Sequence, residues 1–177
     1  MTQIKYNVAQ LLRELIGARR AYDLYEDQLP LDDTLVLRDI GGRVLFTRTA
    51  TGVLVHAQVQ AMVQLTCVRS LELFDYRVSL DFQEEMHAQI DVTTGVHLPR
   101  PSEEDPFFLD EQHMADVGEL IREYTLLELP VYPVSVAYAG KPIRYTVESN
   151  GLTDESDGQM IDERLAVLKT WSQQQSS

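Results

Sequence analysis

The sequence predicts an α+β fold: a mainly antiparallel sheet, curved or formed into a partial barrel, with two or three flanking helices. The first observation is a long central hairpin over residues 52–86, in which apolar and polar side chains alternate with period two. The second is that the strand-like runs before it are joined by short connections, which favours antiparallel pairing. The third is that helical spacing of apolar residues is confined to stretches near the start, the middle and the end of the chain.

The central hairpin consists of two alternating runs of opposite parity. In residues 53–67 every odd position is apolar or small, and most even positions are polar. After a polar turn at residues 69–72, the apolar side chains take the even positions of residues 74–82. Two such runs around a short turn indicate an antiparallel hairpin. Because each run exceeds the usual strand length of about 3–10 residues, we expect the sheet to coil, to bulge or to change face.

The first residues predict a short strand, at residues 4–6, followed by a helix. Asn7 stands at an N-cap position, and Gly17 is placed to end the helix in a left-handed conformation. We expect the apolar face of this helix to pack on the sheet. A partner-binding or membrane-surface helix is the alternative, which the weakly basic polar face disfavours. The apolar face has helical spacing and consists of Val8, Leu11, Leu12, Leu15 and Ile16.

Three further strands are expected before the central hairpin, at residues 19–26, 34–40 and 43–49. Residues 27–33, which include a proline, are expected to form a loop. Gly41-Gly42 predicts a tight turn, so that the second and third of these strands form a hairpin of their own. The chain then turns at residues 50–52 into the central hairpin.

The residues directly after the central hairpin predict a long loop. Residues 86–92 either extend the second central strand or begin an edge strand, and residues 93–110 contain three prolines typical of a loop. Within this loop, Phe107 and Phe108 have two interpretations. We expect them to pin the loop to the core; docking of a partner is the alternative.

A second helix is expected between Asp116 and Pro130. Asp116 is its N-cap, with Glu119 at the capping-box position three residues later. Two short strands are expected after it, at residues 131–138 and 143–147. The whole of residues 1–147 is then a single domain. The remainder is expected to comprise an acidic linker at residues 148–160, a C-terminal helix at residues 161–171 and a disordered tail at residues 172–177.

Composition and charge restrict the partners and the compartment. Lys and Arg number 15 against 28 Asp and Glu, which gives a formal net charge of -13. Because phosphates attract Lys and Arg, RNA binding over the whole surface is disfavoured, while a local basic patch or a basic ribosomal protein as partner fits the charge. A single cysteine excludes an intramolecular disulfide. The chain has neither a signal-peptide core nor an apolar run of about 20 residues, so we expect a cytoplasmic protein without membrane contact.

Four stretches resemble segments of one bacterial family. The sequence CVRSLE, residues 67–72, is similar to a Cys-x-Arg-Cys-Leu-Glu signature. Residues 7–17 resemble the opening helix of the same family, residues 45–55 its Thr-Arg-Thr…Gly-x-x-Val segment, and residues 161–169 its closing helix. The family is that of the large ribosomal RNA subunit accumulation proteins, the YceD family. The matching positions of the signature are Cys67, Arg69, Ser70, Leu71 and Glu72.

The resemblance implies a role in the accumulation or maturation of large-subunit ribosomal RNA. Its implied partner is a ribosomal protein or pre-ribosomal RNA, and not DNA. The family usually carries further cysteines that look like metal ligands, but two of these positions hold Ser70 and Ser135 here. A structural zinc needs about four N or S ligands, which one thiol and four histidines without paired spacing do not supply. We therefore expect no metal and no cofactor, with Cys67 a small core residue and His56 on the outer face.

Catalysis is not expected. No P-loop, dinucleotide glycine fingerprint, His-Glu-x-x-His or Gly-x-Ser-x-Gly motif occurs in the chain. Adjacent carboxylates occur at residues 32–33, 84–85 and 103–104, but neighbours in a strand point to opposite faces, so we expect solvated charges. The sequence therefore favours a protein that is not an enzyme.

Arginines are the remaining candidates for contacts with a partner or with RNA. Arg48 and Arg69 lie in the motif-like segments, and Arg19, Arg20 and Arg43 add basic density in the first third of the chain. A guanidinium can bind a phosphate or a carboxylate through two hydrogen bonds. For Arg48 and Arg69, the alternative that we prefer is an internal salt bridge to one of the many acids.

Together these features predict a non-enzymatic ribosome-biogenesis factor that supports large-subunit (23S) rRNA accumulation through protein or rRNA contacts. A small-molecule-binding protein with a pocket in a partial β-barrel is the alternative from another class. A convex basic patch favours the first function, and a deep apolar pocket favours the second.

Overall fold

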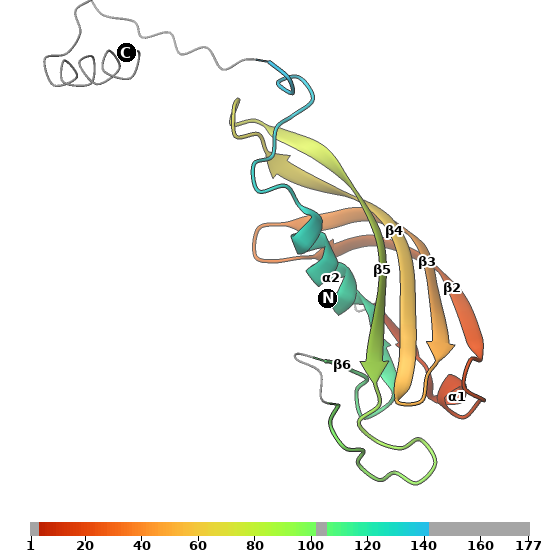
Figure 1. Cartoon of the computed structure of the whole chain (residues 1–177). Coiled ribbons are helices and arrows are strands. Elements are labelled where there is room, and N and C mark those ends of the chain that lie inside the picture. Colours follow the sequence, from red (N-terminus) through yellow and green to blue (C-terminus); the bar gives the residue numbers. More distant parts are fainter. Residues whose placement is uncertain (1–3, 102–105, 142–177) are drawn as a thin grey trace, which may run out of the picture. The chain divides into compact units, whose positions relative to one another are not determined.

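A five-stranded sheet and one main helix form the framework of the computed structural model, which describes residues 4–101 and 106–141. The sheet order is β2 (Arg19–Pro30), β3 (Val36–Arg48), β4 (Gly52–Thr66), β5 (Leu73–His87) and β6 (Phe107–Phe108) (Figure 1). Strands β2 to β5 pair antiparallel in chain order, and β6 adds to β5 in parallel. A small second sheet pairs β1 (Lys5–Asn7) with β7 (Met114–Asp116). None of the helices in the described part is long and apolar enough to cross a membrane.

The central hairpin is the one that the sequence predicts. Strands β4 and β5 pair from Gly52↔His87 to Thr66↔Leu73 without a register shift. The odd residues from Val53 to Cys67 are all buried, with at most 7% of any of them exposed. In β5 the even residues Val78, Leu80 and Phe82 are buried too, so the parity change at the turn is confirmed.

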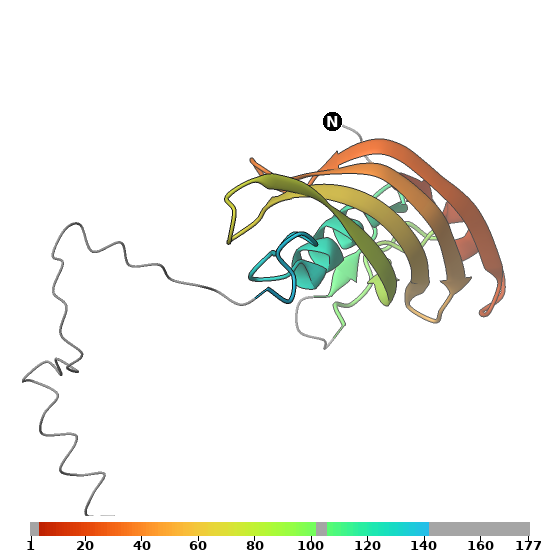
Figure 2. The ribbon, with the colours of Figure 1, turned by 90° about the horizontal axis from the view of Figure 1, so that it is seen from above.

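The sheet is curved and open, and it arches over α2 (Val117–Glu128), as Figure 2 shows from above. Asp116 caps this helix by accepting a hydrogen bond from the Glu119 N–H at 3.1 Å, as predicted. The buried side of α2 fills the concave face of the sheet, and the Tyr124 ring stacks on Phe82 with centroids 4.2 Å apart. The concave side is therefore a packed core, in which Leu120 and Ile121 are completely buried.

The predicted hairpin around Gly41-Gly42 is wrong, because both glycines lie inside the single strand β3. A Cβ on Gly42 would lie 2.1 Å from the carbonyl oxygen of Gln58, so the strands approach too closely for a side chain there. A register shift between Arg38 and Gly41, with Asp39 at φ 51°, marks a bulge beside them. The bulge therefore lies in β3, whereas β4 and β5 pair with each other without a register shift.

The first helix is shorter than predicted. Helix α1 covers Ala9–Leu12, and Leu15 and Ile16 are largely exposed instead of packing on the sheet. The carbonyl of Leu12 accepts a hydrogen bond from Arg48 Nε at 3.1 Å, and the Gly17 N–H donates to the Arg48 carbonyl at 2.8 Å. These contacts with the end of β3 turn the chain into β2, so tertiary contacts end the helix one turn after it begins.

The loop after the central hairpin is attached to the sheet by its two phenylalanines, as expected. Phe107 and Phe108 form β6 and are half-buried, and Leu109 behind them is completely buried. The predicted strand at residues 131–138 is wrong, because the N–H groups of Tyr138 and Ala139 both donate to the Ser135 carbonyl in a turn. The predicted strand at 143–147, linker at 148–160, helix at 161–171 and tail at 172–177 lie outside the described residues.

Candidate interaction surface at the hairpin tip

The signature residues form the tight turn between β4 and β5. The N–H of Cys67 donates to the Glu72 carbonyl at 2.8 Å, and the N–H of Leu71 donates to the Cys67 carbonyl at 2.9 Å. Leu71 adopts a left-handed conformation with φ 61°, which closes the turn. This geometry directs the Leu71 side chain into solvent, where 78% of the residue is exposed.

The segment that follows α2 packs against this turn. The N–H of Val68 donates to the Pro133 carbonyl at 2.9 Å, and Arg69 Nη1 donates to the Tyr138 carbonyl at 2.9 Å. The N–H of Ser135 donates to Cys67 Sγ at 3.5 Å. Residues 67–73 and 131–140 therefore form one surface, which we call the hairpin tip.

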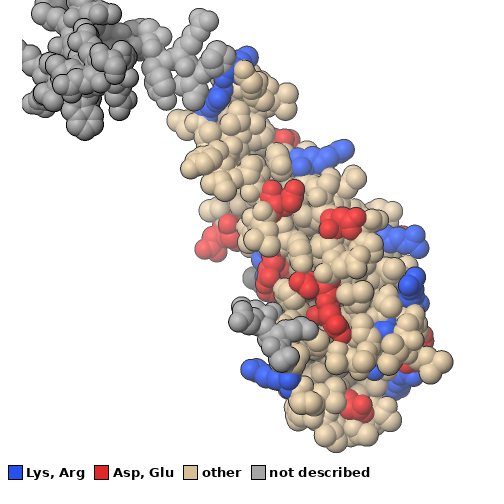
Figure 3. Space-filling view, in the orientation of Figure 1, with Lys and Arg blue, Asp and Glu red and all other residues tan. Residues whose placement is uncertain are grey.

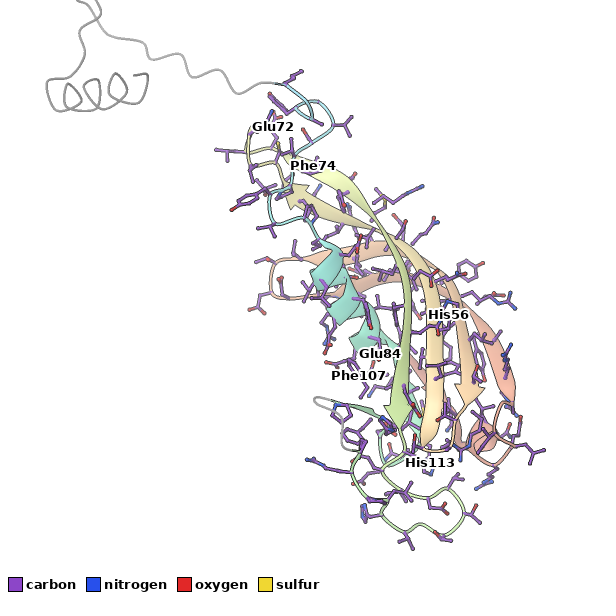
Figure 4. The ribbon with its side chains drawn as sticks, viewed as in Figure 1. His56, Glu72, Phe74, Glu84, Phe107 and His113 are labelled. Carbon is purple, nitrogen blue, oxygen red and sulfur yellow. The ribbon has the colours of Figure 1, made fainter. Side chains whose placement is uncertain are left out.

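Apolar side chains dominate the hairpin tip. Its exposed members are Val68, Leu71, Leu73, Val131, Tyr132 and Val136, with Val136 92% exposed. Figure 3 shows mainly uncharged surface at this end of the sheet, and Figure 4 labels Glu72 and Phe74 there. Exposed apolar side chains that gather on one surface are typical of a site of protein association.

Cys67 lies beneath the hairpin tip and is completely buried. The N–H of Ser135, the N–H and hydroxyl of Ser70 and the N–H of Arg69 lower the pKa of its thiol to about 6, against the opposing effect of burial. The expectation of a small buried residue is confirmed, but the amide donors of the turn also favour a thiolate at neutral pH. The structure thus brings Ser70 and Ser135 to the same sulfur. In the ranges 4–101 and 106–141, no three His, Cys, Asp or Glu side chains gather as metal ligands would.

The five candidate arginines do not form one patch. Arg69 lies at the hairpin tip, whereas Arg19, Arg20 and Arg48 lie at the opposite end of the sheet (Figure 1). Arg43 lies between these ends on the convex face, where its neighbours across the strands are Asp23 and Gln58.

Besides Arg69 at the hairpin tip, two further candidate arginines are held by neighbouring groups of the fold. Arg48 donates to the carbonyls of Leu12 at 3.1 Å, of Gly52 at 2.9 Å and of Thr49, so it ties the β3–β4 turn to α1. We preferred an internal salt bridge for Arg48, and this interpretation is wrong. Backbone carbonyls, and not carboxylates, accept the hydrogen bonds of its guanidinium. Arg20 forms an ion pair with Glu14 and donates to Gln10.

The convex face carries a polar row that includes His56, as expected. His56 Nε2 lies 2.9 Å from Asp81 Oδ1, and the Gln58 amide donates to the same carboxylate at 3.0 Å. The bond from Gln58, and then that from His56, lowers the pKa of Asp81. The side chain of Arg43, one residue pair along, makes no hydrogen bond or ion pair with any residue whose placement the structure gives.

One feature near the hairpin was not found from the sequence. A cleft of about 550 Å³ lies between α2 and β6, with Met86, Phe107 and Phe108 as its apolar part. Its acidic wall consists of Asp116, Glu119 and Glu123, and carboxylates gather on this face of the molecule in Figure 3. Figure 4 shows Glu84 and Phe107 at the same level of the fold. The helical spacing of the three acids was visible in the sequence and could have indicated a common acidic face. No pattern in the neighbouring sequence predicts that the phenylalanines lie opposite them.

Comparison with known proteins identifies the family. The family model described as "Large ribosomal RNA subunit accumulation protein YceD" matches residues 55–170, which include most of the central hairpin, α2 and the hairpin tip. Neither the curated proteins nor the solved structures provide a match to the chain. The matched residues cover well over half of the sequence, and the family's name ties it to large-subunit ribosomal RNA. The chain therefore belongs to the YceD family of large ribosomal RNA subunit accumulation proteins.

Proposed function

We propose that this protein is a non-enzymatic ribosome-biogenesis factor of the cytoplasm, which supports accumulation of large-subunit (23S) rRNA by binding a ribosomal protein or pre-ribosomal RNA. Family membership supports the rRNA role. The observation that carries the proposal is the hairpin tip, where the family-like signature is exposed on a turn that hydrogen bonds hold in place.

The hairpin tip has the properties of a binding surface. Its backbone is anchored by the bonds from Val68 to Pro133 and from Arg69 to Tyr138, so little ordering is required on association. Leu71, Tyr132 and Val136 leave most of their surface in water in the free protein. Covering such residues is favourable by about 25 cal/mol per Å² of apolar area. These features favour a protein contact at the tip.

Any RNA contact has to be local, because the net charge of -13 repels phosphates at long range. Of the candidate arginines, Arg19, Arg43 and Arg69 reach the surface, whereas Arg20 and Arg48 serve the fold. We therefore assign direct RNA contact, where it occurs, to Arg19, Arg43 and Arg69. We assign Arg48 to structural support of the β3–β4 turn.

A small-molecule pocket inside the sheet has less support. That function needs an open apolar interior, but α2 occupies the concave face and buries Leu120 and Ile121 completely. The cleft beside α2, of about 550 Å³, has an acidic wall.

The test is deletion of the gene in its host and measurement of the ratio of large-subunit to small-subunit rRNA. We expect the ratio to fall and to be restored by the wild-type gene but not by Leu71→Asp, which places a charge on the hairpin tip. Leu15→Asp is the matched control, because Leu15 is 87% exposed at the other end of the sheet. An unchanged ratio on deletion would remove the rRNA role. Rescue by Leu71→Asp as good as that by Leu15→Asp would remove the tip as the contact surface.

A further inference from the structure

The outer edge of β2 is unpaired. In the sheet order β2 has β3 on one side, and no other strand of the described ranges pairs with it. The hydrogen bond from the Arg48 N–H to the Ala18 carbonyl, at 2.8 Å, sets the phase of the β2–β3 ladder. The N–H and carbonyl groups of successive residues in a strand point to opposite sides of that strand. From Arg20 up to the bulge in β3, the even residues of β2 therefore form hydrogen bonds with β3. The N–H and carbonyl groups of Arg19, Ala21, Asp23 and Tyr25 therefore point away from the sheet.

These four residues make the edge accessible to another strand. All four are exposed, Tyr25 by 80%, and their side chains lie on the convex face. None of the four is proline, so each outward N–H can donate; the proline of the strand, Pro30, lies at its far end. A row of unpaired backbone groups is a template for pairing with a further strand.

We propose that the occupant of this edge is β2 of a second copy of this chain, paired antiparallel about a two-fold axis so that the two sheets become continuous. The charge pattern of the strand is complementary to itself. Arg19 and Arg20 lie at its start, and Asp23, Glu26 and Asp27 follow in its middle. An antiparallel copy places the basic start of each strand beside the acidic middle of the other, which is the self-complementarity that a two-fold interface needs.

The same side chains select a register. Since the outward backbone groups belong to odd residues, odd residues must oppose odd residues across the axis. If Arg19 pairs with Tyr25 and Ala21 with Asp23, the outward N–H and carbonyl groups of all four residues form hydrogen bonds with the second copy. This register places the Arg19 guanidinium over a tyrosine ring and diagonal to Asp23 of the second copy. A shift by two residues in one direction places Asp23 opposite Asp23, with like charges in contact. A shift by two in the other direction places Arg19 opposite Asp23, but it leaves the outward backbone groups of Tyr25 without a partner in β2 of the second copy. The side chain of Arg19, which makes no hydrogen bond or ion pair with other described residues, thereby gains a partner.

This pairing does not rest on the proposed rRNA function, because the hairpin tip lies at the opposite end of the sheet from Arg19 (Figure 1). It assigns Arg19 to contact between copies, and it leaves Arg43 and Arg69 for other partners.

The test is the mass of the full chain in solution, measured by sedimentation equilibrium up to about 100 µM. We expect a dimer for the wild type and for Ala21→Thr, and a monomer for Ala21→Pro. Proline removes an N–H that β3 does not use, so the thermal midpoint of the monomer should be unchanged. A monomeric wild type at the highest concentration would overturn the proposal. So would a dimer that persists in folded Ala21→Pro, because it would have to use another surface, such as the edge of β5.

A charge exchange tests the contact of Arg19 with Asp23 of the second copy, and it decides the case if Ala21→Pro does not fold. Arg19→Glu should weaken the dimer about fivefold, and the double variant Arg19→Glu/Asp23→Arg should recover most of the loss. The thermal midpoint of each variant at low concentration controls for effects within one chain. No weakening by Arg19→Glu, or no recovery in the double variant, would contradict this pairing.

Discussion

Cys67 lies where the buried row of β4 meets the turn of the hairpin, and both neighbourhoods determine its chemistry. Its place at the end of the odd, apolar series predicts burial, and the residue is completely buried. The amide donors that surround the sulfur come from residues 69, 70 and 135, two of them in the turn and one after α2. The sequence indicated the first property, but the lowered pKa of the thiol depends on a contact across 68 residues of chain.

This lowered pKa makes the stability of the protein depend on pH in a predictable direction. The thiol titrates near 6 in the folded protein and near about 8.5 in the unfolded chain. The folded state therefore binds fewer protons between these values, so the contribution to stability is complete above about pH 8.5 and is lost as the pH falls through 6. We expect the difference in melting temperature between wild type and Cys67→Ser, both reduced, to change in this window in that sense.

Absorbance of the thiolate at 240 nm gives an independent measurement of the same pKa. Cys67→Ser is the blank for this titration, because Cys67 is the single cysteine of the chain. A thiol that titrates above pH 8 in the folded protein would contradict the role of the turn amides, and a melting-temperature difference that is constant with pH would do the same.

Strand β3 shows that a pair of glycines can lie inside a strand as well as in a turn. In the sequence, Gly41-Gly42 between two β-like runs predicts a turn. In the structure the same pair lies within one strand beside a bulge, and the actual hairpin turns are at residues 31–35 and 49–51. In the first of them, Asp32 Oδ1 accepts the N–H groups of Thr34 and Leu35, each at 2.7 Å, which makes a local alternative to a glycine turn.

The two glycines should differ sharply when each is changed to alanine. A Cβ at Gly42 would lie 2.1 Å from the Gln58 carbonyl oxygen, whereas a Cβ at Gly41 would have its nearest neighbour, the Tyr25 ring, at 3.8 Å. We expect Gly42→Ala to reduce the free energy of unfolding by about 2–3 kcal/mol, since the backbone of β4 must shift. Gly41→Ala, the matched control, should change it by less than about 0.5 kcal/mol. Urea denaturation gives both values, and equal effects would refute the close approach of β3 and β4.

Over the described domain, the candidate arginines differ in exposure: some are half-buried and support the fold, and others are exposed to solvent. Arg48 and Arg20 are bound by carbonyls, an amide and a carboxylate of the N-terminal region. Arg43 and Arg69 lie on the convex face and at the hairpin tip, and acids gather along α2 and β5 (Figure 3). If the protein contacts RNA as proposed, we expect that binding to be weak and limited to a few phosphates.

Salt dependence measures this limit. The logarithm of the RNA association constant should fall against the logarithm of the salt concentration with a slope of about 2 or less, because about 0.7–0.9 counterions are released per neutralised phosphate. Arg43→Ala/Arg69→Ala should reduce the slope further. The control Arg13→Ala/Arg77→Ala removes the same charge from other exposed positions and should leave the slope unchanged. A steep slope that both double variants share would show that RNA binds elsewhere.

The sequence by itself determined what repeats over a few residues. Period-two alternation placed Val53 to Cys67 inward, and the Asp116 cap with Glu119 placed the start of α2, because both patterns act between neighbours along the chain. The polar turn predicted at residues 69–72 lies within the observed tip turn, which runs from Cys67 to Glu72. Only the tertiary structure decided that β4 leaves no room for a side chain at Gly42, that Arg48 ends α1, and that residues 131–140 pack on the turn. Each of these contacts joins residues that are distant in sequence. The local sequence is therefore equally compatible with a turn at Gly41-Gly42, with a longer first helix and with a strand at residues 131–138.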